Sequence, residues 1–157
     1  MPEVSSGGRN YLPIGFLDKN VIANNKVYTV SDPSLLVFGF LCSRMHNAWT
    51  QSVSGRLKSD IQYSTGIVYN NFPWPEDVTE AQTAAIERLA QAVLDAREQF
   101  PGSTLADLYD PLTMPPVLAR AHHALDRAVD RLYRKAPFLT DSDRVALLFE
   151  RYQALVG

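Results

Sequence analysis

The chain has 157 residues, of which 46% are hydrophobic, and a formal net charge of −2. This composition supports one ordinary domain or two small ones and excludes a largely disordered protein. The single cysteine, Cys42, excludes an internal disulfide and favours a reducing, cytoplasmic location.

Two further signals concern membranes and targeting. No apolar run approaches the roughly 20 residues that a membrane-spanning helix needs, and the first ten residues, MPEVSSGGRN, lack the apolar stretch of a signal peptide. We therefore expect no membrane among the partners of this chain.

Charge and composition both change near residue 75. Residues 1–75 carry six Lys or Arg against four Asp or Glu, whereas residues 76–157 carry nine against thirteen. The basic excess of the front part favours an anionic partner there, although chance variation between two solvated surfaces explains it equally well. We predict two domains, 1–75 and 76–157.

The front domain is expected to combine strands with one helix. Asp32 followed by Pro33 predicts the start of a largely buried helix over 33–52. Runs rich in Val, Ile, Tyr and Phe predict four strands, at 11–17, 21–30, 56–64 and 66–70.

The back domain is expected to be helical. Thr79 and Gln82 predict a capped helix that ends near Phe100, and one helical turn is expected at 105–109. Pro115-Pro116 opens a second helix to about residue 134, and Thr140 caps a third. Five apolar positions at spacings of three and four form a packing seam on the second helix: Leu118, Ala121, Leu125, Ala128 and Leu132. The predicted fold class is therefore α+β, a small strand–helix–strand unit followed by a three-helix bundle.

Several motifs suggest catalysis but do not support it. Asn71-Phe72-Pro73-Trp74 is similar to the loop with which amino-methyltransferases hold a flipped base, but its second position is Phe and no methyl-donor loop precedes it. The side chains of the adjacent residues His122 and His123 point about 100° apart on a helix, which favours a surface or interface role over a shared metal. Cys42 is expected in the core. We therefore predict no catalytic residue, no metal and no cofactor within this chain.

A cluster of polar residues remains between positions 44 and 63. Their side chains are of the types that contact phosphates and base edges in DNA, although an ordinary polar surface has the same composition. The cluster consists of Arg44, His46, Asn47, Gln51, Ser54, Arg56, Lys58, Asp60, Gln62 and Tyr63.

The sequence as a whole resembles the C-terminal end of MmeI-like restriction–modification enzymes, single chains that join an endonuclease, an adenine-N6 DNA methyltransferase and target recognition. The resemblance runs through the segments SSGGRNYLPIGFLD, SLLVFGFLCSRMHNAWTQSVSGRLKSDIQYS, IVYNNFPWP and LADLYDPLTMPPVLARAHHALDRAVDRLY. One departure is Gly7-Gly8, where the family more often carries charged residues. The order of helix, Ser-Gly, strand and FPWP is also similar to the specificity subunits of type I restriction systems.

The resemblance implies a role for each part. Residues 1–75 would be the latter part of a DNA target recognition domain, and residues 76–157 a C-terminal helical domain. The partners would be double-stranded DNA, bound weakly by this part alone, and a methyltransferase domain of the same parent chain that holds S-adenosylmethionine. The alternative is a freestanding helical interaction module that dimerises through the seam of residues 118–132.

Lys58 and Asp60 are the residues expected to contact bases. The residues expected to contact the DNA backbone or to support the site are Arg44, Asn47, Gln51, Ser54, Arg56, Gln62 and Tyr63. If Lys58 and Asp60 lie on one strand, they project from the same face, because side chains alternate along a strand. Lys can donate to O6 and N7 of guanine, and Asp can accept from N4 of cytosine, so the pair matches one G·C pair. In the family, the strand after SGRL is associated with choosing a base near one end of the site. The alternative is a surface ion pair worth at most ~1 kcal/mol.

Overall fold

The computed structural model describes residues 1–157. The elements along the chain are, in order, β1 (Val4–Ser5), α1 (Leu35–Leu41), α2 (Arg44–Val53), β2 (Gly55–Leu57), β3 (Asp60–Gln62), the π-helix η1 (Thr65–Tyr69), α3 (Glu80–Glu98), α4 (Leu105–Leu108), α5 (Pro116–Tyr133) and α6 (Asp141–Val156). These elements confirm the α+β class.

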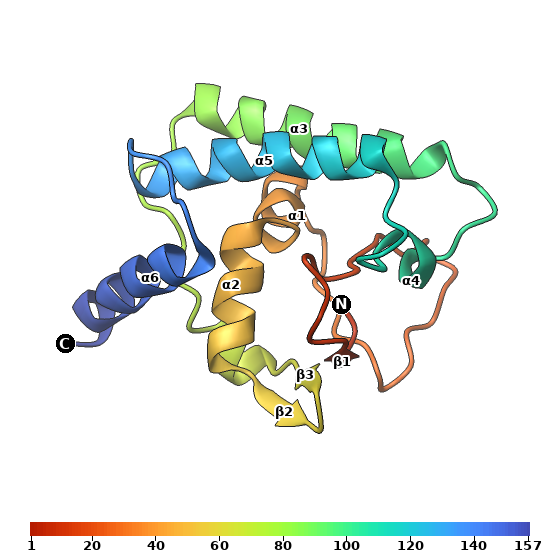
Figure 1. The fold of residues 1–157 in the computed structure, drawn as a ribbon, viewed down its shortest axis with the longest axis horizontal. Coiled ribbons are helices and arrows are strands. Elements are labelled where there is room, and N and C mark those ends of the chain that lie inside the picture. Colours follow the sequence, from red (N-terminus) through yellow and green to blue (C-terminus); the bar gives the residue numbers. More distant parts are fainter.

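The long helices α3 and α5 lie side by side across one end of the molecule (Figure 1). The short helix α1 packs against α3, and α2 runs away from this pair toward a small sheet at the opposite end. The sheet has three antiparallel strands in the order β1-β3-β2. None of the helices combines the length and the apolar character needed to cross a membrane.

The predicted helices of the back part are confirmed. Thr79 caps α3 and forms a reciprocal capping box with Gln82, while Thr140 forms one with Asp143 at the start of α6. The predicted helical turn at 105–109 is α4, and Pro116 is the first residue of α5.

The third of these helices packs differently from the expected bundle. Helix α6 lies against α2 of the front part, while α3 and α5 pair with each other. Aromatic contacts explain this position, since the ring of Trp49 on α2 lies 5.3 Å from that of Phe149 and 5.8 Å from that of Tyr152. The two parts of the chain therefore share a packing surface.

The single helix expected over 33–52 is divided into α1 and α2. Two residues lie between them, and the second, Ser43, has extended backbone angles and caps α2 through its side chain, which accepts from the N–H of His46. The first cap is also shifted, because Ser34 and not Asp32 caps α1. Asp32 instead takes a positive φ of 46° in the preceding loop.

The segment 56–64, expected as one strand, is part of the β2–β3 hairpin. Leu57 pairs with Asp60, so Lys58 and Ser59 form a two-residue turn. The prediction that Lys58 and Asp60 share one face of a strand is therefore wrong. Lys58 has a φ of 58°, in the left-handed region that favours Gly or Asn in such turns.

The other three predicted strands are wrong, and in two of these segments a carbonyl group accepts a hydrogen bond from a side chain. Residues 11–17 form an extended segment on the helices, where the side chain of Arg97 donates to the carbonyl of Ile14 over 2.7 Å. Residues 21–30 form a loop with one isolated bridge at Val27. Residues 66–70 fall largely in η1, whose Val68 carbonyl accepts from the indole N–H of Trp49 over 3.0 Å.

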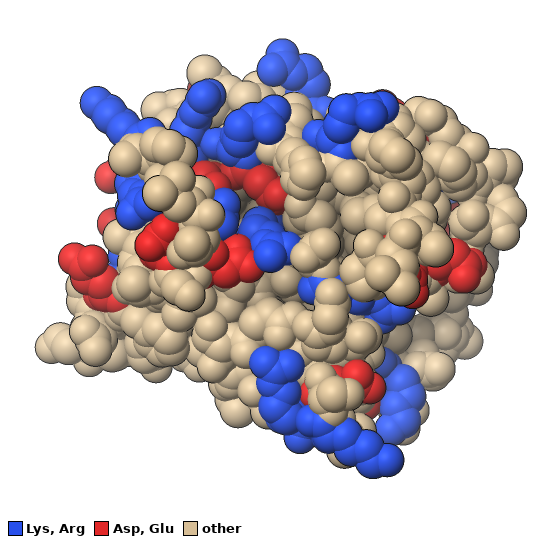
Figure 2. All heavy atoms as spheres, in the orientation of Figure 1, with Lys and Arg blue, Asp and Glu red and all other residues tan.

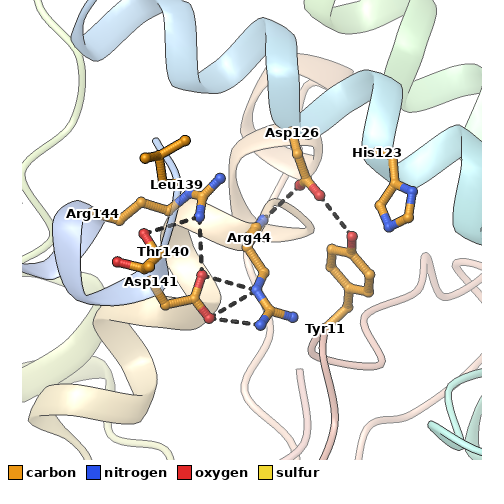
Figure 3. A pocket seen from close by; sticks show the side chains of 8 residues that line it. All are labelled: Tyr11, Arg44, His123, Asp126, Leu139, Thr140, Asp141 and Arg144. Carbon is orange, nitrogen blue, oxygen red and sulfur yellow. Dashed lines mark hydrogen bonds and ion pairs between the residues drawn. The ribbon is translucent and has the colours of Figure 1, made fainter. Parts of the chain in front are cut away.

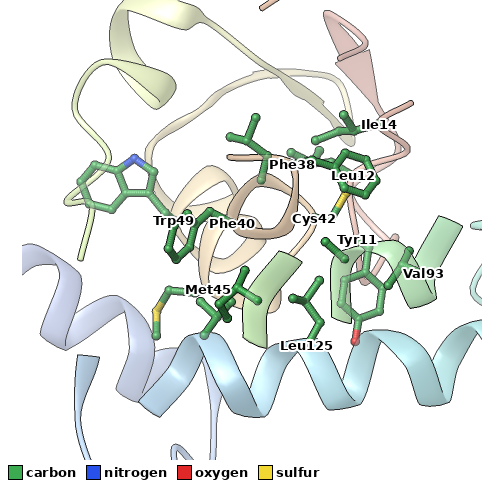
Figure 4. Packing of buried hydrophobic residues seen from close by; sticks show 14 of the residues in the cluster. Tyr11, Leu12, Ile14, Phe38, Phe40, Cys42, Met45, Trp49, Val93 and Leu125 are labelled. Atoms are coloured by element: carbon green, nitrogen blue, oxygen red, sulfur yellow. The ribbon is translucent and has the colours of Figure 1, made fainter. Parts of the chain in front are cut away.

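One hydrophobic core extends across both parts of the chain. Figure 4 shows buried side chains of the front segment and of α1 and α2 meeting Val93 of α3 and Leu125 of α5. Cys42 is completely buried here, as expected. Leu118 and Leu125 of the predicted seam are also completely buried within the chain, and the other three seam residues, Ala121, Ala128 and Leu132, are partly buried against the same core.

Candidate functional site

The β2–β3 hairpin extends from the end of α2, and side-chain hydrogen bonds hold the end of the hairpin that is next to α2. Below its turn, the guanidinium of Arg56 donates to the backbone carbonyl of Gln51 over 3.0 Å and to its side-chain oxygen over 3.2 Å. Gln51 in turn donates to the carbonyl of Gly7 over 3.0 Å. A Cβ atom on Gly7 would lie 2.5 Å from the carbonyl oxygen of Ser59, so only glycine lets this loop approach the turn so closely.

The tip of this hairpin carries two charges that have no partner within the chain. Lys58 is exposed and Asp60 is half-buried, and neither forms an ion pair or a side-chain hydrogen bond with any residue. The surface ion pair considered as an alternative is therefore absent. Both groups remain free to bind a ligand.

The two faces of the hairpin differ in character. Ile61 is 1% exposed and anchors the inner face in the core, whereas Asp60 and Gln62 lie on the opposite face. Leu57, which pairs with Asp60 across the hairpin, is 54% exposed. Figure 2 shows Lys and Arg side chains around this end of the molecule, with acidic atoms among them.

Three of the residues expected to contact the DNA backbone or to support the site have buried polar groups. Asn47 is buried and donates to the carbonyl of Asn10 over 2.9 Å. Tyr63 is buried with its hydroxyl 3.3 Å from Nε2 of His46. Ser54 ends α2 as its C-cap, with a buried hydroxyl that has no hydrogen-bond partner. Burial lowers the pKa of His46 to about 3.

Arg44 lines a polar cavity of about 330 Å³ that includes no residue of the β2–β3 hairpin. Its guanidinium forms an ion pair of 2.7 Å with Asp141 at the start of α6, and its backbone N–H donates to Asp126 of α5 over 2.8 Å. Tyr11 also donates to Asp126, over 2.6 Å (Figure 3). The contacts of Arg44 therefore connect α2 to both α5 and α6.

Helix α5 also carries two carboxyl groups, Asp126 and Asp130. Both are buried, and Asp130 pairs with Arg144 over 2.6 Å. Burial raises the pKa of Asp126 to about 6, against the opposing hydrogen bonds from Tyr11 and from the N–H of Arg44.

His122 was expected at the surface or at an interface and is completely buried. Its Nε2 lies 2.7 Å from the hydroxyl of Tyr109, which itself accepts from Arg97 of α3. Burial lowers the pKa of His122 to about 3. The signal in the sequence was its spacing, since residue 122 falls on the same helical stripe as Leu118 and Leu125.

The aromatic residues of the FPWP segment pack into the core. Phe72 is buried, and its ring meets those of Trp74 and His46 at 5.0 Å each. The side-chain amide of Asn71, the position that would hold a target base, donates to the carbonyls of Gly66 and Ile67. No three His, Cys, Asp or Glu residues converge in a way that could hold a metal ion.

Comparisons with known proteins agree with this architecture. Residues 1–76 match the family model of the MmeI target recognition domain, and residues 78–157 match that of the MmeI C-terminal domain. DNA methyltransferase A of Bacillus subtilis (strain 168) is 43% identical over 155 residues, which cover 99% of this chain and 17% of that protein.

A solved structure matches equally well. It is described as the type IIL restriction-modification enzyme MmeI in complex with DNA, and it superposes with a TM-score of 0.95 at 48% identity. The match covers 99% of this chain and 21% of that one, so the chain spans about one fifth of the length of its relatives. The chain therefore belongs to the MmeI family, with residues 1–76 corresponding to its target recognition domain and residues 78–157 to its C-terminal domain.

Proposed function

We propose that this chain is the sequence-reading and scaffolding part of an adenine-N6 DNA methyltransferase or restriction–modification enzyme. The observation that carries the proposal is the unpaired charges of Lys58 and Asp60 at the tip of a hairpin with a buried, fixed base. A short β-ribbon is narrow enough to enter the major groove of DNA. The hairpin is the reading element.

Lys58 and Asp60 read one G·C pair. The ammonium group of Lys58 donates to O6 and N7 of guanine, and the carboxylate of Asp60 accepts from N4 of the paired cytosine. The guanine lies on the strand that carries the methylated adenine. Because Lys58 is in the turn and Asp60 begins β3, the two groups approach the base pair from the tip and from the side of the hairpin.

The remaining polar residues support this element or contact the DNA backbone. Gln62 lies exposed on the same hairpin face as Asp60. Arg56 and Gln51 brace the base of the hairpin. Four residues act from the interior or the cavity as supports: Arg44, Asn47, Ser54 and Tyr63.

The activity of the whole protein belongs to parts beyond these 157 residues. The residues present do not fit S-adenosylmethionine, because the strands are antiparallel and only two or three residues long, with no glycine-rich turn from a parallel strand into a helix. The partners proposed for this chain are double-stranded DNA and the methyltransferase domain of the same parent protein, in the cytoplasm. The similarity to an enzyme described in complex with DNA supports this assignment.

The chain alone should bind DNA weakly. The basic excess of residues 1–75 is only two charges, and the back part is acidic. We expect a dissociation constant of ~10⁻⁴ M or weaker at physiological salt.

Weak binding of this kind is measured by NMR titration of the ¹⁵N-labelled chain with duplex DNA at low salt. The amides of residues 55–62 should shift with DNA concentration, and Lys58→Gln should reduce those shifts. Lys19→Gln is the matched control, since it removes the same charge from an exposed turn outside the hairpin. Unchanged hairpin amides in the wild-type chain at saturating DNA would contradict the proposal.

A further inference from the structure

The charged residues of α5 are sorted between its two faces. The two carboxylates of this helix, Asp126 and Asp130, are buried and hydrogen-bonded inside the molecule. Its three arginines, Arg120, Arg127 and Arg131, are all exposed. The outer face of α5 is therefore positive although residues 76–157 carry four more acidic than basic residues.

These three arginines form a line, which we call the arginine ridge. Spacings of seven and four residues place them within about 40° of one another around the helix axis. At 1.5 Å per residue, the ridge is about 16 Å long. Figure 2 shows Lys and Arg side chains in a row along the part of the surface where α5 lies.

The arginines of the ridge have no partner within the chain. None of them forms an ion pair or a side-chain hydrogen bond. Five other arginines are committed to internal carbonyls, carboxylates or rings: Arg44, Arg97, Arg134, Arg144 and Arg151. The free guanidinium groups of the ridge are therefore available for an external anion.

The surroundings of the ridge favour phosphate over an acidic protein surface. Stable protein interfaces have an apolar centre, usually with aromatic anchors, but none of the large exposed hydrophobic side chains lies on α5. A guanidinium fork matches the geometry of a phosphate group. Each DNA strand carries one phosphate per 3.4 Å of helix axis, so a ridge about 16 Å long that lies along the axis spans about five phosphates of one strand.

We propose that Arg120, Arg127 and Arg131 bind the phosphate backbone of duplex DNA at a surface separate from the β2–β3 hairpin. The ridge adds affinity that is independent of sequence, while the hairpin chooses the base pair. This inference depends on the proposed function to the extent that both require DNA binding. The two proposals can nevertheless be refuted separately, because the ridge and the hairpin lie on different elements.

The test is the salt dependence of DNA binding by the chain, measured between about 20 and 150 mM salt. Each phosphate contact contributes about 0.9 to the slope of log K against log[salt]. The triple variant Arg120→Gln, Arg127→Gln, Arg131→Gln should therefore lose between two and three units of slope. The control variant with Lys at the same three positions keeps the charges and should retain most of the slope.

Two further measurements complete the test. Thermal unfolding should be nearly unchanged in both triple variants, because these exposed side chains have no internal partners. In an NMR titration, the Nε–Hε resonances of the three arginines should shift with duplex DNA and remain in place with an acidic peptide of equal charge.

Three results would overturn the inference. The first is an unchanged slope in the glutamine variant, and the second is a response of the arginine resonances to the peptide but not to DNA. The third is an absence of any DNA binding by the chain, which would also remove the proposed function. A response of the ridge without any response of residues 55–62 would support the ridge and contradict the role of the hairpin.

Discussion

The contact between Gly7 and the hairpin turn leads to a prediction about one added methyl group. In a Gly7→Ala variant, the new Cβ would lie 2.5 Å from the carbonyl oxygen of Ser59 and 3.1 Å from Nη1 of Arg56. Ordinary contact begins at 3.4 Å, so the turn must move by about 0.9 Å or the loop must yield. Gly8→Ala is a matched control, because its Cβ meets only the hydroxyl of Ser6 at 3.9 Å.

The difference between the two variants isolates the clash. Neither glycine has a positive φ, so both substitutions restrict the unfolded chain and should each stabilise the protein by about 0.4–1 kcal/mol on that account. Overpacking at Gly7 costs about 1–3 kcal/mol, so Gly7→Ala should be less stable than Gly8→Ala by about that amount.

Urea unfolding of both variants measures this difference, and amide shifts of residues 55–62 report the movement of the turn. A displacement of this size should also weaken base discrimination, since recognition depends on placement to within about 0.5 Å. Equal stability of the two variants, with the hairpin amides in the same positions, would refute the reasoning.

Three other predictions concern the core, the response to pH and catalysis. Leu125→Ala should lower the free energy of unfolding by about 2–5 kcal/mol, because the side chain is completely buried; a change below about half a kcal/mol would show that the seam is not core. Burial lowers the pKa of His46 and His122 to about 3 in the folded state, so stability is complete above the unfolded pKa of about 6.5 and falls as pH drops toward 3. The pKa of Asp126 is raised to about 6, so protonation of Asp126 stabilises the folded state between pH 6 and 4 and partly offsets the effect of the histidines. The free energy of unfolding, measured with urea, should therefore fall by on the order of 2 kcal/mol from pH 7 to pH 5. A free energy of unfolding that does not change with pH would contradict the burial of both histidines. Finally, incubation of the chain with labelled S-adenosylmethionine and DNA should transfer no methyl group, and transfer above background would contradict the assignment of methyl-donor binding to another part of the protein.

Local signals in the sequence predicted the helices well. The Thr79 and Thr140 caps and the proline start of α5 depend on residues within one turn of each other, and all three are confirmed. The strands were poorly predicted, because β-type composition at 11–17 and 66–70 reflects burial and not pairing. Whether such a segment pairs depends on distant partners, here Arg97 and Trp49, which local reasoning could not identify.

The candidate site shows the same limit. Lys58 and Asp60 were predicted to share one face of a continuous strand, but a two-residue turn begins at Lys58. The first position of this turn is neither Gly nor Asn, so the sequence SGRLKSDIQ gives no signal for it. The buried carboxylates of α5 were missed because their partners, Tyr11, Arg44 and Arg144, lie far away in sequence. Lys58, which is exposed, and Asp60, which is half-buried, nevertheless have no ion-pair partner in the chain.

The most direct test of the central claim is a charge exchange at the hairpin tip in the complete parent protein, which we propose to be an adenine methyltransferase. The double variant Lys58→Glu, Asp60→Arg reverses the order of basic and acidic groups, and methylated adenines are then mapped across a genome. Lys58→Arg with Asp60→Glu is the control, because it keeps the order of charges and should keep guanine. We predict a switch from guanine to cytosine at a single position of the recognition sequence, with each bidentate contact worth ~1–3 kcal/mol of discrimination. An unchanged recognition sequence with full activity in the exchanged variant would contradict the account.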